Sequence, residues 1–282
     1  MNNSRQTNVW EKHASQWVRV GAPLRPSPID NTLMRSAIES SLRPRGQVSR
    51  IGILGVTPEL VGMAWSKNTE LIAFDHSELM IRDVWQPNSD VPCHVTLSNW
   101  QSLPLETHSL DCLIGDNSMG ALPSLSEYKW VFAELLRVLK PSGKLCLRCF
   151  IAPEHSEPVD KIFKDVMAKR IKNFHVLKLK LAITLSKYPT YSVFVKDIHA
   201  LFDITFPNRV ELSKLTGWNL DVINTIDAYR GSETVYTFPT LEAVKEVASP
   251  WIAIESISTP DYELGDRCPT LTFCPNKKPR LK

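Results

Sequence analysis

Two short segments hold the residues whose types and spacing could do chemistry. Residues 51–60 read Ile-Gly-Ile-Leu-Gly-Val-Thr-Pro-Glu-Leu, and residues 71–75 read Leu-Ile-Ala-Phe-Asp. The first segment is an apolar run followed by a turn at Gly55. The second is an apolar run that ends at the carboxylate of Asp75. On the first two strands of a parallel sheet, such a turn approaches a nucleotide-type ligand and such an acid accepts hydrogen bonds from ribose hydroxyls. The turn has one glycine where a dinucleotide fingerprint has three, so neighbouring segments must decide which ligand is bound.

The elements that would position these residues alternate between strand and helix. Apolar and β-branched runs predict strands at residues 48–54, 71–75, 93–97, 110–115 and 143–150, and helical periodicity predicts helices at 58–65, 76–85 and 125–139. Proline and glycine at 141 and 143 are expected to stop the last of these helices. This alternation favours an α/β fold with a doubly wound, seven-stranded, mostly parallel sheet and a closing antiparallel strand.

The pattern changes after residue 150. Residues 159–187 read as one long basic amphipathic helix, and residues 193–229 as a mostly helical stretch without strand alternation. A helix at 240–247 and closing strands at 251–258 and 270–273 follow. We therefore expect four parts: an N-terminal arm (1–47), a core (48–150 and 236–275), a helical lid inserted into that core (151–235), and a basic tail (276–282).

Composition indicates an ordinary soluble globular protein of 282 residues, 43% hydrophobic and 22% charged. No apolar run is long enough for a membrane span, and the first residues lack the apolar core of a secretory signal, so we expect a cytoplasmic protein. The net charge of +3 includes basic clusters, but these lack interleaved aromatic platforms, which favours solvated faces over a nucleic-acid site. The oligomeric state is not indicated by the sequence.

The cysteines do not point to a metal or redox site. Cys146 and Cys149 form a Cys-x-x-Cys motif, but both lie in a predicted strand, where a spacing of three places them on opposite faces. No second pair supplies the remaining ligands of a zinc site, so no metal is expected.

The order of elements resembles that of the class I S-adenosylmethionine-dependent methyltransferases over most of residues 48–274. The matching pieces are the turn at 55–60, Asp75, residues 98–100 (Ser-Asn-Trp) and residues 115–119 (Gly-Asp-Asn-Ser-Met). Residues 134–145, Glu-Leu-Leu-Arg-Val-Leu-Lys-Pro-Ser-Gly-Lys-Leu, resemble the family's Leu-x-x-x-Leu-Lys-Pro-Gly-Gly signature before the fifth strand.

The resemblance implies S-adenosylmethionine as the cofactor and methyl transfer to an N- or O-nucleophile of a small molecule. The implied cofactor-binding residues are Gly55, Val56, Thr57, Pro58, Asp75, His76, Met80, Asn99, Trp100, Asp116, Asn117 and Ser118. Asp116 is also the candidate catalytic group, since it could accept a proton from the nucleophile, although it could instead cap the turn that follows it. For Met80 and Trp100, the alternative to cofactor binding is ordinary packing in the protein core.

Two departures from the family pattern keep other functions open. Thr57 stands where the family has a second glycine, and Asn99 stands where it often has an acid. The alternatives are a partner-binding or regulatory protein that has lost catalysis, a nicotinamide-dependent oxidoreductase and an RNA methyltransferase.

The lid is expected to select the substrate, because open α/β sheets bind ligands beyond the carboxyl ends of their strands. The candidate substrate residues are Arg148, His175, Lys178, Tyr229 and Arg230. In the arm, residues 17–26 read Trp-Val-Arg-Val-Gly-Ala-Pro-Leu-Arg-Pro, which is similar to a leader found in a subset of bacterial methyltransferases. That similarity implies an arm folded over the cofactor side, and the alternative is a proline-stiffened lead-in whose Arg25 pairs with the domain surface.

Overall fold

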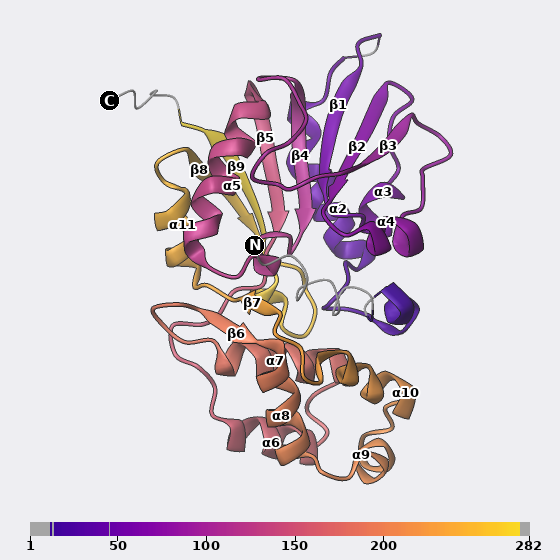
Figure 1. Cartoon of the computed structure of the whole chain (residues 1–282), viewed down its shortest axis with the longest axis vertical. Coiled ribbons are helices and arrows are strands. Elements are labelled where there is room, and N and C mark those ends of the chain that lie inside the picture. Colours follow the sequence, from indigo (N-terminus) through magenta and orange to yellow (C-terminus); the bar gives the residue numbers. More distant parts are fainter. Residues whose placement is uncertain (1–11, 13, 45, 277–282) are drawn as a thin grey trace.

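A seven-stranded sheet forms the upper body of the molecule (Figure 1). The structure is a computed structural model that describes residues 12, 14–44 and 46–276. The strand order is β3-β2-β1-β4-β5-β9-β8, with parallel pairing from β3 to β5 and β9 antiparallel to both β5 and β8. The strands are β1 (Ser49–Leu54), β2 (Thr69–Asp75), β3 (Cys93–Leu97), β4 (Leu110–Asp116), β5 (Leu139–Arg148), β8 (Ile252–Ser258) and β9 (Thr270–Pro275). The predicted α/β fold with a mostly parallel sheet is confirmed.

Helices cover both faces of this sheet because successive strand residues point to opposite faces. On one face, Ile51 and Ile53 pack in a cluster with residues of α2 (Pro28–Ile38) and α3 (Pro58–Val61). On the other, Leu54 and Leu113 share a cluster with residues of α5 (Leu125–Val138) and α11 (Leu241–Ala248). The remaining elements of this region are α4 (Glu78–Val84), η2 (Glu39–Ser41), η3 (Met119–Ala121) and η5 (Gly265–Arg267). The carboxyl ends of the parallel strands all face the lid (Figure 1).

The junction between α5 and β5 differs from the expectation that Pro141 and Gly143 separate helix from strand. Helix α5 ends at Val138 and β5 begins at Leu139, so both residues lie inside the strand. The register jumps from Leu110 opposite Leu139 to Cys112 opposite Lys144. A proline cannot donate a ladder hydrogen bond, and this bulge gives Pro141 a place where none is needed.

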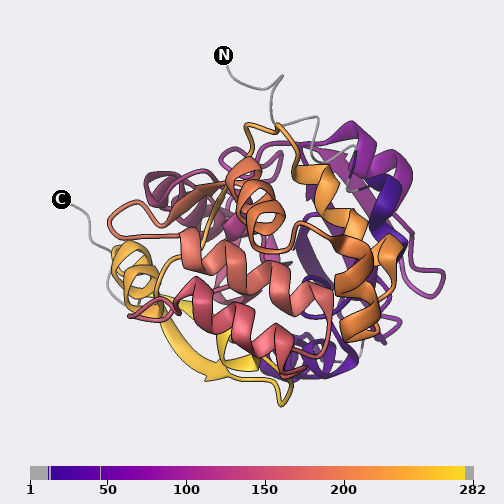
Figure 2. The ribbon, with the colours of Figure 1, turned by 90° about the horizontal axis from the view of Figure 1, so that it is seen from below.

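The lid lies below the sheet in Figure 1 and faces the viewer in Figure 2. It has a hydrophobic core of its own. Its elements are α6 (Val159–Met167), α7 (Phe174–Leu185), α8 (Val195–Thr205), α9 (Arg209–Thr216), α10 (Leu220–Ile223), η4 (Asn224–Tyr229) and the strands β6 (Ser192–Phe194) and β7 (Val235–Thr237). Two expectations were wrong here. The single helix over 159–187 is two helices, because Lys169 adopts a left-handed φ of 56° and Asn173 caps a new helix by accepting from the Val176 amide. The stretch expected to lack strands contains β6, which pairs antiparallel with β7.

The described part of the N-terminal arm includes η1 (Trp17–Arg19) and leads into α2. Ser27 and Asp30 form a capping box at the start of α2, in which each side chain binds the other residue's backbone amide. The buried Asp30 also accepts a hydrogen bond from the Tyr262 hydroxyl at 2.9 Å. These contacts fix the direction of the chain where the arm passes into α2.

None of the helices in the described ranges is both long enough and apolar enough to cross a membrane.

Candidate functional site

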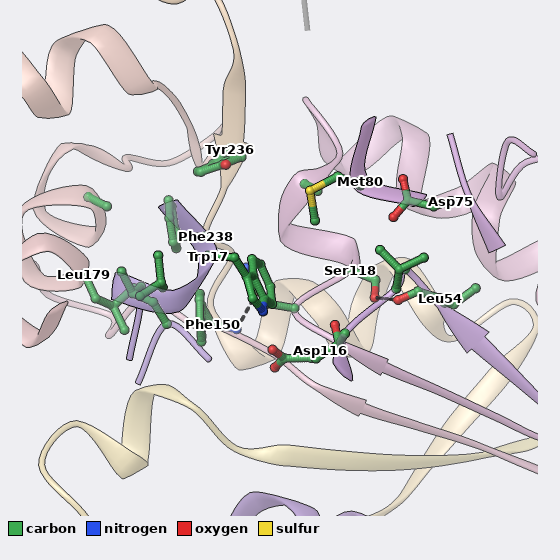
Figure 3. Close-up of a pocket in the computed structure, with 18 of the residues that line it drawn as sticks. Trp17, Leu54, Asp75, Met80, Asp116, Ser118, Phe150, Leu179, Tyr236 and Phe238 are labelled. Atoms are coloured by element: carbon green, nitrogen blue, oxygen red, sulfur yellow. Dashed lines mark hydrogen bonds between the residues drawn. The ribbon is translucent and has the colours of Figure 1, made fainter. Parts of the chain in front are cut away.

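A cavity lies between the carboxyl ends of β1, β2 and β4 and the lid (Figure 3). Its empty volume is about 1070 Å³ including the opening to solvent. Ten predicted cofactor residues line it: Gly55, Val56, Thr57, Asp75, His76, Met80, Trp100, Asp116, Asn117 and Ser118. The structure therefore brings together most of the residues that the sequence pattern singled out.

The turn after β1 brings the backbone of Gly55 against the end of β2. Gly55 has a φ of 98°, a conformation that costs glycine little and other residues much, and its amide donates to the Phe74 carbonyl at 2.8 Å. A Cβ placed on Gly55 would lie 3.9 Å from Oδ2 of Asp75. The turn and the carboxylate are thus direct neighbours, as their spacing in sequence predicts.

Asp75 is a buried carboxylate at the cavity wall, with an exposed fraction of 6%. Its Oδ1 accepts a hydrogen bond from the Ser77 amide at 2.9 Å, while Ser77 caps α4 by accepting from the Met80 amide. Burial raises the pKa of Asp75, and the Ser77 amide and nearby His76 oppose that rise. A buried acceptor beside a glycine turn suits the hydroxyl donors of a ribose.

Trp100 and His76 form the next part of the wall. The Trp100 indole donates to the Phe74 carbonyl at 2.7 Å, and the His76 ring meets it edge-on with centroids 6.3 Å apart. Trp100 therefore fills the core and also lines the cavity, which joins the two roles that the sequence left open. Asn99 lies instead in an adjoining hollow that also touches His76 and Trp100, and Pro58 begins α3 outside the cavity lining.

The loop after β4 is held by a buried ion pair. Arg148 is fully buried, and its Nε binds Oδ1 of Asp116, whose side chain is 6% exposed. Arg148 also donates to the Pro23 carbonyl at 2.8 Å and lies 3.7 Å from the Asp30 carboxylate. Burial raises the pKa of Asp116 and the Arg148 charge opposes that rise. Arg148, a candidate substrate residue, thus lies behind Asp116 rather than in the cavity lining.

Asn117 and Ser118 complete this loop through contacts with neighbouring strands. Asn117 has a φ of 47°, and its side-chain oxygen accepts from the Phe150 amide at 3.0 Å. The Ser118 hydroxyl donates to the Leu54 carbonyl at 2.7 Å. With Asp116 held by Arg148, all three side chains have structural partners, and the role of Asp116 as a proton acceptor stays a prediction.

The N-terminal arm supplies Trp17, Val20 and Leu24 to the cavity wall. Arg25 positions this segment: it donates to the Trp17 carbonyl at 2.8 Å, its guanidinium carbon lies 4.8 Å from the Trp17 ring centre, and it forms an ion pair with Glu59. The sequence pattern suggested only that the arm folds over this side, and it did not assign these three residues to the site. The sequence signal that could have found these three residues was the apolar spacing of the arm next to Arg25.

Further lining residues that sequence reasoning missed come from just after β5, from the lid and from the segment after it. Phe150, Leu179, Ala182, Tyr236 and Phe238 all line the cavity. Figure 3 shows Tyr236, Phe238 and Leu179 on one side of the cavity, with Met80, Asp75 and Ser118 on the other. Alternating strand and helix patterns locate the ends of sheet strands, but they do not show which face of an inserted helix turns inward.

Of the four predicted substrate residues other than Arg148, two lie in the lid wall and two do not. Lys178 and Tyr229 line the cavity, with the Lys178 amine 3.9 Å from the centre of the Tyr229 ring. Burial lowers the pKa of Lys178 to about 7. His175 packs against Gly21 of the arm, and burial followed by the Lys178 charge lowers its pKa to about 4. Arg230 is largely exposed and pairs with Asp227.

The residues of the sheet side fit an adenosine-type cofactor. Gly55 lacks the Cβ that would project toward Asp75, which leaves room for a ribose at that carboxylate. The Trp17 indole nitrogen is buried at the same cavity without a hydrogen-bond partner in the part of the chain that the structure describes. Such an unpartnered donor fits a ligand that carries acceptors.

Comparisons with known proteins agree with this geometry. Residues 55–147, from the Gly55 turn to near the end of β5, match the family model of a methyltransferase domain. No curated protein sequence matches the chain at a significant level.

Among solved structures, the chain is similar to a Rhodobacter sphaeroides protein described under the heading of Zn-dependent alcohol dehydrogenases, with a TM-score of 0.64, 12% identity, and coverage of 97% of this chain and 100% of the other. It is also similar to the CcbJ methyltransferase of Streptomyces caelestis, with a TM-score of 0.54, 11% identity, and coverage of 96% and 98%. Such identities show a shared fold alone. Within residues 12, 14–44 and 46–276, no group of three or more His, Cys, Asp or Glu side chains is placed to hold a metal ion. The domain match and the fold together support the class I S-adenosylmethionine-dependent methyltransferase family.

Proposed function

We propose that this protein transfers a methyl group from S-adenosylmethionine to an N- or O-nucleophile of a small molecule held in the cavity. The observation that carries the proposal is the contact between the Gly55 turn and the buried Asp75 carboxylate, inside a segment that matches a methyltransferase domain. A nicotinamide-dependent oxidoreductase would use the same turn and acid, but the domain match favours methyl transfer.

The sheet side of the cavity would hold the cofactor. Asp75 would accept hydrogen bonds from the ribose hydroxyls, with His76, Met80 and Trp100 flanking the adenine. The turn at Gly55, Val56 and Thr57 and the loop at Asp116, Asn117 and Ser118 would surround the rest. When bound, S-adenosylmethionine supplies a methyl group activated by a sulfonium charge.

The lid side would hold the acceptor. Methyl transfer is a displacement at carbon, so the protein's main tasks are to align the nucleophile and to exclude water. Aromatic and aliphatic side chains from the lid and the arm surround this half of the cavity. Because this half is a recessed cavity rather than a flat basic surface, it suits a small molecule better than an RNA.

An untargeted transfer assay tests the proposal. The full chain would be incubated with methyl-labelled S-adenosylmethionine and either a small-molecule extract or total RNA, and labelled products would be separated by size. We expect label in the small-molecule fraction. Label confined to RNA would contradict the small-molecule proposal, and cofactor binding with no label in either fraction would favour the partner-binding alternative motivated by Thr57 and Asn99.

A further inference from the structure

The acceptor half of the cavity has aromatic walls. Tyr229, Tyr236 and Phe238 come from the lid and the segment after it, Phe150 follows β5, and Trp17 of the arm lies between these residues and the sheet side (Figure 3). The hydroxyls of Tyr229 and Tyr236 hydrogen-bond to each other, so each buried hydroxyl has a hydrogen-bond partner. Aromatic side chains stack on flat, apolar molecules with little loss of conformational freedom. These walls select a flat, largely apolar ligand.

One charged side chain interrupts the lid wall. Lys178 of α7 is 3% exposed, and it is the charged member among the cavity-lining residues of the lid (Lys178, Leu179, Ala182, Tyr229 and Tyr236). Across the described ranges Lys178 forms no ion pair, and its amine lies over the face of the Tyr229 ring. A buried amine without an anionic partner is costly, because burial removes its hydration without replacing it.

Other basic residues of the same segment do not share this position. Lys180, two residues later, binds Glu157 at 2.7 Å, and Arg170 pairs with Asp165. Lys178 therefore differs from its neighbours in pointing into the cavity rather than pairing with a lid carboxylate.

The titratable groups around Lys178 do not neutralise it. His175 lies one turn earlier on α7 and is itself buried, and the amine meets the face of the Tyr229 ring. Burial raises the pKa values of Tyr229 and Tyr236, so neither hydroxyl supplies a negative charge. The cavity carboxylates Asp75 and Asp116 come from the opposite, sheet side, and Asp116 is bound by Arg148. The lid amine is thus left to be paired by a ligand.

We propose that Lys178 binds an acidic oxygen group of the methyl acceptor, so that the acceptor is a flat, apolar molecule with one carboxylate or phenolate. The acidic group would lie at Lys178 and the apolar body against the aromatic walls. This assignment of the acceptor rests on the proposed methyl transfer, whereas the binding of an aromatic acid at Lys178 can be tested without turnover.

Calorimetric titration at pH 8 tests the assignment with three probes of one shape: 2-naphthoate, 2-naphthol and the neutral 2-naphthamide. The full chain is used with and without saturating S-adenosylhomocysteine, and each titration is repeated in buffers of different ionisation enthalpy to count protons. We expect at least one acidic probe to bind about tenfold or more tightly than the amide.

The proton count separates the two acidic groups. With a pKa of about 7, Lys178 is mostly neutral at pH 8, so binding a carboxylate should take up about 0.9 proton from the buffer. Binding 2-naphthol should give almost no net uptake, because the phenol supplies the proton that the amine receives. A naphthoate complex with no proton uptake would contradict a role for Lys178, and this result needs no variant.

Matched variants on α7 localise the effect. Lys178→Met should abolish both the preference for acidic probes and the proton uptake while S-adenosylhomocysteine still binds, and Lys180→Met should change neither. The inference is overturned if no acidic probe binds better than the amide, or if Lys178→Met keeps the preference. Failure of S-adenosylhomocysteine binding alongside normal binding of the acids would instead contradict the proposed methyl transfer.

Discussion

At the scale of single residues, the two carboxylates of the cavity are held in different ways: the Ser77 amide donates to Asp75, and Arg148 forms an ion pair with Asp116. Arg148 was expected to face the substrate, yet it is fully buried between Asp116, the Pro23 carbonyl and Asp30. Its partners come from the arm and from β4, which are far from it in sequence, so periodicity could not reveal the pairing.

Replacing Arg148 tests this buried network. Arg148→Met should lower the free energy of unfolding by about 3–5 kcal/mol, since it leaves the Asp116 and Asp30 carboxylates buried without a counter-charge. Urea denaturation measures the change. Lys144→Met on the same strand removes the partly exposed pair with Glu255 and should cost less than about 1 kcal/mol. Equal losses for the two variants would contradict the structural role of Arg148.

Lys178 should make stability depend on pH. Its pKa is about 7 in the folded chain against an ordinary value of 10.5, so between these pH values the unfolded chain holds a proton that the folded chain lacks. Wild-type stability gains from rising pH by up to about 1.4 kcal/mol per unit in this window, and Lys178→Met lacks this gain. Urea denaturation at pH 7 and pH 9 should show that the wild type gains stability relative to Lys178→Met as the pH rises. Parallel pH profiles would rule out a perturbed Lys178.

At the scale of elements, the sheet and its covering helices followed from local patterns, whereas the arm and the lid did not. Strand ends and the Ser77 cap of α4 are set by neighbours in sequence, so they were predicted closely. The break between α6 and α7 depends on a left-handed Lys169 and on the cap at Asn173. Apolar spacing continues across that break, which is why one helix was expected.

The arm is an element whose placement can be tested through Arg25. Arg25→Met should weaken S-adenosylmethionine binding by up to about tenfold, because Trp17 must then be immobilised on binding rather than beforehand. The change should have little effect on the fold, since the arm is also held through Asp30 and Pro23. Calorimetry measures the affinity, with the exposed Arg19→Met as the control. Unchanged affinity in Arg25→Met would show that the arm does not contribute to the cofactor site.

At the scale of the whole molecule, the site exists only where sheet, arm and lid meet. The α/β architecture was predictable because each βαβ unit shows the same alternation of strand and helix patterns in the sequence. That architecture places the ligand site at the carboxyl ends of the strands. The aromatic half of the cavity depends on how an independently packed helical lid sits over that edge. Such long-range packing has no period in the sequence, which explains why Phe150, Leu179 and Phe238 were not foreseen.

One cavity shared by two parts of the molecule should respond as a unit to its ligand. Saturation with S-adenosylhomocysteine at 100 times its dissociation constant should add about 2.7 kcal/mol to the free energy of unfolding. Amide hydrogen exchange should slow in α4 and α7, which border the cavity, and remain unchanged in α9, which does not. Slowing in α9 equal to that in α7 would indicate a general effect rather than binding in this cavity.

The central claim is that the Gly55 turn and Asp75 hold S-adenosylmethionine. Calorimetric titration of the full chain with S-adenosylmethionine tests it most directly, with NADH titrated in parallel. We expect saturable one-to-one binding of S-adenosylmethionine, weakened by at least about tenfold in Asp75→Ala because charge-assisted hydrogen bonds to the ribose are lost, and retained in Asp83→Ala on the exposed side of α4. Absence of saturable heat with S-adenosylmethionine, or binding of NADH in its place, would contradict the account.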